Sequence, residues 1–241
     1  MTPIKINDHI VKLSFQKLKT DNSFHSTKVE KIEEKYGTES QFFVINKNEE
    51  PTFLFAYHKA LEAVKIKNRK YILNLGINKG DEFDLIQKIV EARVFDKMRL
   101  IGVDHSSSAL NFAKKRFPKD NVEFYQQDIN KIDELELDRS DLIISIGTLQ
   151  SPSINYKPFL MSLVQRQLTE NGALILGFPN SRWIDSELIY GAKAPNYSYS
   201  EMSLLFGDVI FAKKYLQQKK FRVTITGREY IFLTATKIGA K

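Results

Sequence analysis

The sequence predicts an α/β fold: a doubly wound, mostly parallel seven-stranded sheet with helices on both faces and an antiparallel C-terminal hairpin. Strand and helix patterns alternate from residue 71 onward, as they do when parallel strands are joined by right-handed helical crossovers. The strand segments are almost continuous apolar runs, which parallel strands covered on both faces require. Two strand patterns separated by a short loop close the chain, at 221–226 and 230–236, and predict the hairpin.

The predicted elements follow one another in a regular order. Residues 1–50 are polar and mixed in charge, and we expect a partly helical N-terminal extension with a short helix or strand at 10–18 and a helix at 26–37. Pro51 opens the next helix, and residues 51–241 form the main domain. Further strands are expected at 71–75, 99–105, 121–128, 140–148 and 171–178, and helices at 81–94, 106–117, 156–168 and 204–218.

The stretch from Tyr71 to Gly80 organises the main domain. A buried strand runs into a turn bracketed by Gly76 and Gly80, and an amphipathic helix begins directly after it. The first turn of a helix carries unpaired N–H groups and a positive dipole end, so this is a natural seat for a carboxylate or a phosphate. Such turns serve several nucleotide-containing cofactors and also occur as plain strand-to-helix connections, so the turn alone decides nothing.

Composition excludes several classes of protein. The 241 residues contain no apolar run of about 18 residues, no apolar leader segment and no cysteine, so we expect a cytoplasmic protein without a membrane partner or a cysteine nucleophile. The four histidines are scattered without ligand spacing, so we expect no metal site. Residues 151–241 carry a net charge of +6 out of +7 for the chain, which fits either an anionic partner or solvated lysine faces.

Four features together make residues 53–236 resemble the class I S-adenosylmethionine-dependent methyltransferases. They are the turn LNLGINKG after the first strand, Asp104 closing the second strand, Asp128 closing the third, and the reversed C-terminal hairpin. In an open α/β sheet, ligands bind outside the carboxyl ends of the strands, so the side chains that end these strands line one crevice. The resemblance implies a Rossmann-like enzyme that uses S-adenosylmethionine and releases S-adenosylhomocysteine.

The resemblance also implies cofactor-binding roles for individual residues. Asp104 would accept hydrogen bonds from both ribose hydroxyls, and Asp128 would accept one from the adenine amino group. His105 and Ile129 would sandwich the adenine ring, with the Ile129 N–H facing a ring nitrogen. The full set implied is Asn74, Gly76, Ile77, Asn78, Gly80, Asp104, His105, Asp128, Ile129, Ser145, Ile146 and Gly147, of which the last three would lie beside the methionine portion.

The turn departs from the family pattern at two positions. Asn74 stands where an acid is common, and Asn78 stands where a glycine is common. Asparagine tolerates a left-handed backbone, so Asn78 can keep the shape of the turn. Because Asn74 is neutral, attraction to the cofactor's amino group is weaker unless Asp81 or Asp84 supplies the missing charge. Lys79 is positioned to pair with the methionine carboxylate.

A long insertion between the fifth strand and the next helix is the candidate acceptor site. Residues 179–203 are more than such a connection needs, and long connections are often lids or binding loops. Methyl transfer mainly requires alignment of the acceptor and exclusion of water, with a general base when the acceptor is protonated. We expect Arg182 and Trp183 to contact the acceptor, with Asp185 or Glu187 as the base. The alternative is an insertion packed on the surface.

The acceptor itself is left open by the sequence. The fourth strand is followed by SIGTLQSP rather than NPPY or DPPY, so the resemblance does not point to enzymes that methylate amino groups of adenine or glutamine. We expect a small-molecule acceptor and a monomer or homodimer. The alternatives are an RNA methyltransferase acting on tRNA or rRNA, a catalytically silent cofactor- or RNA-binding module of the same fold, and a nicotinamide-dependent oxidoreductase.

Overall fold

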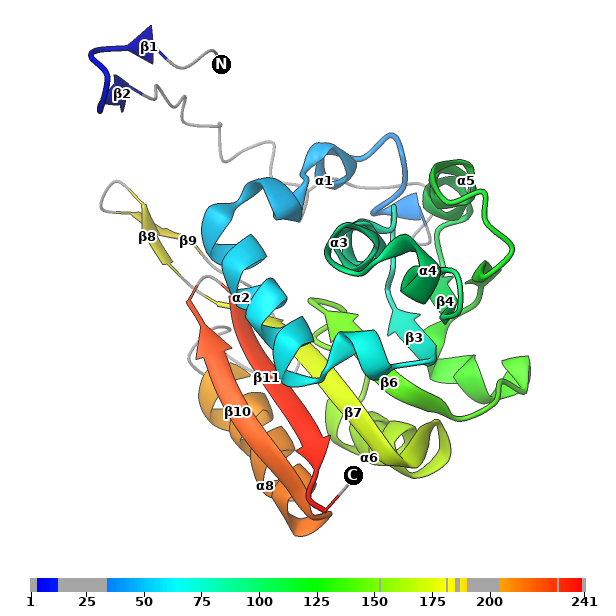
Figure 1. Cartoon of the computed structure of the whole chain (residues 1–241). Helices are drawn as coiled ribbons and strands as arrows, with labels where there is room; N and C mark the ends of the chain where they lie inside the picture. The colour runs from blue at the N-terminus through cyan, green and yellow to red at the C-terminus, as the bar shows by residue number, and fades with distance from the viewer. Residues whose placement is uncertain are drawn as a thin grey trace.

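A seven-stranded sheet forms the centre of the molecule, with the strand order β10-β11-β7-β6-β3-β4-β5 (Figure 1). The computed structural model describes residues 4–12, 34–151, 153–180, 182–184, 187–189, 204–228 and 230–239. The strands are β3 (Tyr71–Leu75), β4 (Arg99–Asp104), β5 (Val122–Gln126), β6 (Ser140–Ile146), β7 (Leu168–Pro179), β10 (Phe221–Gly227) and β11 (Tyr230–Lys237). β11 pairs antiparallel with both β7 and β10, whereas the other neighbouring strands of this sheet pair in parallel, so the predicted fold class is confirmed.

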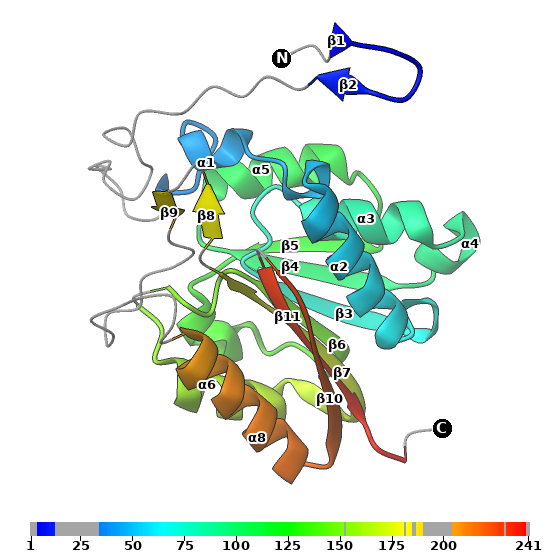
Figure 2. The same cartoon turned by 90° about the vertical axis from the view of Figure 1, so that its left-hand side faces the viewer.

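Helices cover both faces of the sheet (Figure 2). One face carries α2 (Pro51–Ala63), α3 (Asp81–Ile89), α4 (Ala92–Phe95) and α5 (Ser107–Arg116), and the other carries α6 (Tyr156–Arg166) and α8 (Ile210–Gln218). Each face has its own hydrophobic cluster, and the central strands β3 and β6 contribute side chains to both. Burial on both faces explains why these strands read as continuous apolar runs. No helix within the described ranges is long and apolar enough to cross a membrane.

Short elements connect and flank this framework. They are α1 (Gln41–Val44), η3 (Lys47–Glu49), η4 (Ile66–Asn68), η5 (Ile129–Leu135), the π-helix η6 (Leu204–Val209) and two small hairpins, β1 (Ile4–Lys5) with β2 (Val11–Lys12) and β8 (Arg182–Ile184) with β9 (Glu187–Ile189). The strand or helix expected at 10–18 and the helix expected at 26–37 lie mostly outside the described residues.

Aromatic packing fixes α2 against the last strand of the sheet. Tyr57 stacks on Phe232 with ring centroids 5.9 Å apart, and both side chains are fully buried. Phe53 meets Tyr230 edge to face at 5.2 Å. Such pairs add to the free energy gained from burying the rings, so they hold the start of β11 close to the N-terminal end of α2.

Two predicted helices differ from the observed ones. The helix expected at 81–94 is broken, because Val90 and Glu91 have extended backbone angles that separate α3 from α4. The break lets Val90 and Phe95 both point into the core, where they are 6% and 1% exposed. The helix expected at 204–218 begins with the wider turns of η6 and becomes α-helical only at Ile210.

Candidate cofactor site at the carboxyl edge of the sheet

The turn between β3 and α3 relies on left-handed backbone conformations. Gly76 has a φ of 74° and Gly80 a φ of 88°, while Asn78 reaches 48°, as its tolerance of this region predicts. A side chain at Gly76 would collide with Thr148, whose Oγ1 lies 2.0 Å from the position of an added Cβ. Only glycine fits there, because the loop after β6 closes directly over the turn.

Asp104, at the end of β4, ties this turn to the neighbouring strand. Its Oδ2 accepts a hydrogen bond from the Asn78 backbone N–H at 2.9 Å, and its Oδ1 accepts one from the Ser106 N–H at 3.0 Å. The residue is 7% exposed. Each carboxylate oxygen has a second lone pair, so Asp104 can still accept bonds from a ligand lying across the strand ends.

Asp128 lies at the same edge as Asp104, two residues beyond the end of the adjacent strand. Asp104 pairs in register with Gln126 on β5, so the two acids end neighbouring parallel strands. Asp128 is exposed and caps η5, accepting from the Asn130 N–H at 2.9 Å. Ile129 beside it is buried. The crevice predicted from the sequence therefore has both of its carboxylates on one side of the molecule.

Several polar atoms at this edge lack partners within the described part of the chain. Both amide atoms of Asn74 are buried without a hydrogen bond, and so is Nε2 of His105. Ser145, at the end of β6, donates to the Leu75 carbonyl at 3.3 Å, and Gly147 has a φ of 73°. Buried polar atoms of this kind are rare unless a ligand or water satisfies them. The donors, acceptors and glycines present fit a nucleoside joined to an amino acid.

The segment 34–50 crosses this edge and contacts the turn. The Asn78 side-chain amide donates to the Tyr36 carbonyl at 2.7 Å. Lys79 donates to the carbonyls of Phe43 and Ile45 at 2.7 and 2.9 Å. Lys79 is therefore engaged with the protein's own backbone rather than free for the methionine carboxylate, which corrects the expectation from the sequence.

The same segment also reaches the first turn of α5, directly after Asp104. The carboxylate of Glu34 accepts hydrogen bonds from the hydroxyls of Ser106, Ser107 and Ser108. Burial works to raise the pKa of Glu34, but these hydrogen bonds outweigh it and lower the pKa overall. The N-terminus of α5 thus already holds an anion that belongs to the chain itself.

The three acids at the start of α3 differ in their surroundings. Arg116 on α5 pairs with Asp81 at 2.7 Å and with Asp84 at 3.1 Å. Both carboxylates are thereby paired with Arg116, so neither is a free acid that replaces the charge missing at Asn74. Glu82 is 5% exposed and has no direct ion pair in the described structure. Burial raises its pKa to about 7, opposed by Lys47 and reinforced by Asp81 and Asp104.

Lys47, Glu82 and Tyr230 form a polar group that sequence reasoning missed. The Lys47 ammonium lies 5.4 Å from the Tyr230 ring centroid and is stabilised by Tyr230 and Glu82. The Tyr230 hydroxyl lies 3.5 Å from where a Cβ on Gly147 would stand. Only Glu82 carried a sequence signal, its place two residues after Gly80, because the other two arrive from distant parts of the chain.

The candidate acceptor residues are only partly described. Arg182 and Trp183 lie on β8 and Glu187 on β9, in a hairpin that pairs Trp183 with Leu188. Figures 1 and 2 show this hairpin beyond the carboxyl end of β7, toward the side where segment 34–50 lies. Asp185 lies outside the described residues, as does most of the remainder of 179–203.

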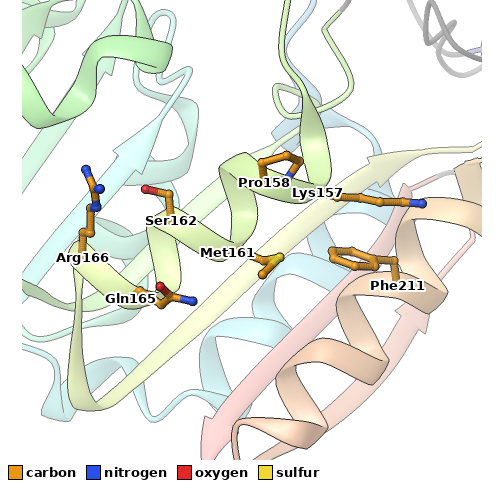
Figure 3. A pocket seen from close by; sticks show the side chains of 7 residues that line it. All are labelled: Lys157, Pro158, Met161, Ser162, Gln165, Arg166 and Phe211. Atoms are coloured by element: carbon orange, nitrogen blue, oxygen red, sulfur yellow. The ribbon is translucent and has the colours of Figure 1, made fainter.

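A surface hollow on the face of the sheet covered by α6 and α8 is separate from this site. It lies between α6 and α8, and Figure 3 shows the side chains that line it: Lys157, Pro158, Met161, Ser162, Gln165, Arg166 and Phe211. None of the predicted site residues is among them. In the described ranges, no group of three or more His, Cys, Asp or Glu side chains could hold a metal ion.

Comparison with known proteins identifies the family. Residues 66–224, well over half of the chain, match a family model described as a methyltransferase domain. The chain belongs to this methyltransferase family. It is a class I enzyme that depends on S-adenosylmethionine. A search of curated proteins found no match.

Solved structures share the fold of this methyltransferase at low sequence identity. A SAM-dependent methyltransferase from Aquifex aeolicus is 21% identical with a TM-score of 0.53, over 80% of this chain and 96% of that one. The methyltransferase domain of bacterial CtHen1 has a TM-score of 0.55 at 17% identity, over 75% and 96%. These two likenesses show the fold. The chain spans 58% of an O-methyltransferase family protein from Burkholderia thailandensis, over 77% of itself, at 10% identity and a TM-score of 0.49.

The buried carboxylate of Glu82 should make stability depend on pH. Its pKa rises from 4.5 to about 7 on folding. Its contribution to the free energy of unfolding is therefore fully present below pH 4.5 and is lost as the pH rises through 7, by about 3 kcal/mol at pH 8. We expect Glu82→Gln to unfold at higher urea concentration than the wild type at pH 8 but not at pH 4.5. Equal midpoints at pH 8, with exposed Glu62→Gln as the control, would contradict the assignment.

Proposed function

We propose that this methyltransferase acts on a small molecule that is bound at the carboxyl edge of the sheet, beneath the N-terminal segment. The observation that carries the proposal is the path of residues 34–50, which cross this edge and bond to the turn through Asn78 and Lys79. A covered edge suits an acceptor that is enclosed more than one that extends beyond the protein. We also propose that residues 1–50 form an extension to a catalytic domain at 51–241, to which they contribute this cover.

In this proposal, residues at the ends of different strands bind different parts of the cofactor. Asp104 accepts hydrogen bonds from the ribose hydroxyls, and Asp128 accepts one from the adenine amino group, with His105 and Ile129 against the ring. The remaining residues lie along the amino-acid portion and the methyl group: Asn74, Gly76, Ile77, Asn78, Gly80, Ser145, Ile146 and Gly147. The support is that all of them meet at one edge and that Asn74 and His105 have buried polar atoms to satisfy.

The chemistry asked of the protein is modest. S-adenosylmethionine supplies an already activated methyl group. The chain's own residues must align an acceptor beside Gly147 and keep water out. The Tyr230 hydroxyl lies beside Gly147, and the Lys47 ammonium lies over the Tyr230 ring, so this side of the crevice offers a hydrogen-bonding group to an acceptor. We propose that Arg182 and Trp183, in the insertion 179–203, contact the acceptor and that Asp185 or Glu187 acts as the base.

RNA is the second candidate acceptor. The support is the charge of the C-terminal third, where exposed Lys214 lies on α8, Lys219 and Lys220 lie in the connection to β10, and Arg222 lies on β10. Basic side chains along a surface neutralise phosphates and fit a polyanion. A catalytically silent module would bind S-adenosylmethionine yet transfer no methyl group to any acceptor, small or RNA, and transfer assays with labelled cofactor distinguish it from the enzyme.

Asp104→Asn should weaken cofactor binding. The variant loses a charge-assisted acceptor for the ribose, so the affinity for S-adenosylmethionine should fall roughly 10- to 100-fold. Calorimetric titration measures this, with thermal unfolding to show that the turn is retained. Asp120→Asn, at an exposed position before β5, is the matched control and should bind as the wild type does. An affinity unchanged in Asp104→Asn would exclude this residue from the site.

Replacing Arg182 and Trp183 together should abolish methyl transfer to the acceptor without affecting cofactor binding. We expect the double alanine variant to lose transfer of labelled methyl groups while it binds S-adenosylmethionine with wild-type affinity. The physical reason is that both residues belong to the insertion and not to the strand ends. Full turnover in the double variant would show that the insertion takes no part in acceptor binding.

Salt distinguishes the two acceptor classes. If RNA is the acceptor, its affinity should fall roughly tenfold for each two phosphates contacted between about 50 and 200 mM salt. A small acceptor in an enclosed site should show no comparable loss. Fluorescence anisotropy with labelled tRNA over this range gives the slope. A steep slope, together with methyl transfer to that RNA, would replace the small-molecule proposal by the RNA one.

A further inference from the structure

Glu82 is a buried acid without a direct ion pair in the described structure. It lies in the first turn of α3, two residues after Gly80, and is 5% exposed. Its neighbours Asp81 and Asp84 are paired with Arg116, whereas the described structure shows no direct ion pair for Glu82. Taking a carboxylate out of water without a contacting partner is costly, so such groups usually mark a place where a ligand supplies the missing charge.

Opposite charge stands near Glu82 but not in contact with it. Burial raises the pKa of Glu82, and Lys47 on η3 acts to lower it. Burial acts to lower the pKa of Lys47, but Tyr230 and, after it, Glu82 raise it overall. Lys47 lies against the rings of Tyr230 and Phe42 instead, 5.4 and 5.6 Å from their centroids. The site therefore presents a carboxylate and an ammonium held apart beside the turn.

The remaining groups around Glu82 do not neutralise it. Tyr57 on α2 donates to its backbone carbonyl at 3.4 Å and not to its carboxylate. The other charged groups that face it are acids, Asp81 on α3 and Asp104 at the end of β4. Glu82 lies in the first turn of α3, directly after the turn that ends at Gly80, so it belongs to the edge of the sheet where the crevice begins.

We propose that Glu82 binds the amino group of S-adenosylmethionine and that Lys47 binds its carboxylate. The inference rests on the proposed location of the cofactor. An amino-acid tail carries an ammonium and a carboxylate, which are the charges complementary to Glu82 and Lys47. Asn74 is neutral, and Asp81 and Asp84 are paired with Arg116. Lys79 is bonded to backbone carbonyls, and Asp104 is assigned to the ribose. Among the described residues, Glu82 and Lys47 are therefore the candidates for the charges of the tail.

Two consequences follow for binding. The N-terminal segment becomes part of the cofactor site, because η3 supplies Lys47. Binding also becomes linked to a proton, since the ammonium group requires an ionised Glu82 that is about half protonated at pH 7 in the free protein. Below pH 7 the cofactor's own amino group stays charged, as an α-amino group titrates at about 7.7–8.0. The affinity should therefore rise with pH across the range from 5.5 to 7.0.

The test is calorimetric titration of the full chain at pH 5.5 to 7.0 with three ligands. S-adenosylmethionine and S-adenosylhomocysteine share the amino-acid tail, and 5′-methylthioadenosine lacks it. We expect about 15-fold weaker binding of the first two at pH 5.5 than at pH 7.0, with proton release that shows in buffers of different ionisation enthalpy. Methylthioadenosine should bind without proton release and with no such pH dependence.

Substitutions test whether Glu82 and Lys47 cause the pH dependence and the affinity for the amino-acid tail. Glu82→Gln, which keeps the shape of the side chain, should bind both tailed ligands more weakly at pH 7.0 and with a flat pH profile. Lys47→Gln should weaken them at every pH, and neither change should alter the affinity for methylthioadenosine. Exposed Glu62→Gln should keep the wild-type profile. Thermal unfolding of each variant checks that the comparison is made on folded protein.

Two results would overturn the proposal in distinguishable ways. The role of Glu82 would be excluded if the wild-type protein bound the tailed ligands without proton release, or if Glu82→Gln retained the pH dependence. Either result would leave the proposed cofactor site in place. The first of these needs no variant, so it stands even if Glu82→Gln does not fold. Wild-type protein that binds none of the three ligands would overturn the proposed function together with this inference.

Discussion

The carboxylate of Asp104 is the tie on which the geometry of the site depends. It accepts one backbone N–H from the turn after β3 and one from the start of α5, so a single buried side chain joins two strand ends. Charge-assisted hydrogen bonds of this kind are stronger than neutral ones. They hold Asn78 in a left-handed conformation that asparagine accepts more readily than most residues. The turn is thereby shaped before any ligand arrives.

The N-terminal segment adds a second layer of constraint above that turn. Glu34 bonds to the serines that open α5, Lys79 reaches up to two carbonyls of the segment, and Lys47 enters beside Tyr230. These contacts run from the adenosine end of the proposed crevice to the methionine end. Segment 34–50 therefore belongs physically with the strand ends and contributes charge as well as cover.

Local patterns predict the framework because local physics produces it. The apolar runs at β3 and β6, the glycines at 76 and 80 and the hairpin at the end of the chain each follow from their own sequence, and together they predict a mostly parallel sheet with one reversed strand. The break at Val90 and Glu91 could not be predicted, because it serves the packing of Phe95 into a core built from other elements.

The charges of the site likewise depend partly on local sequence and partly on tertiary packing. In sequence, Asp81, Glu82 and Asp84 are three equivalent acids at the start of one helix. Their difference comes from Arg116, which lies on another helix and takes two of them. Tyr230 and Lys47 likewise reach the site only through tertiary packing. The places of Asp104 and Asp128 were predictable because a strand end fixes them, and their roles toward a ligand stay predictions.

The central claim is that the cofactor lies across the carboxyl ends of β3, β4 and β5. A crystal structure of the protein with S-adenosylhomocysteine tests it most directly. We expect ribose hydroxyls within hydrogen-bonding distance of Asp104, adenine beside Asp128 and the amino-acid tail over Gly76. Ligand density that avoids Asp104, for example in the hollow between α6 and α8, would contradict it.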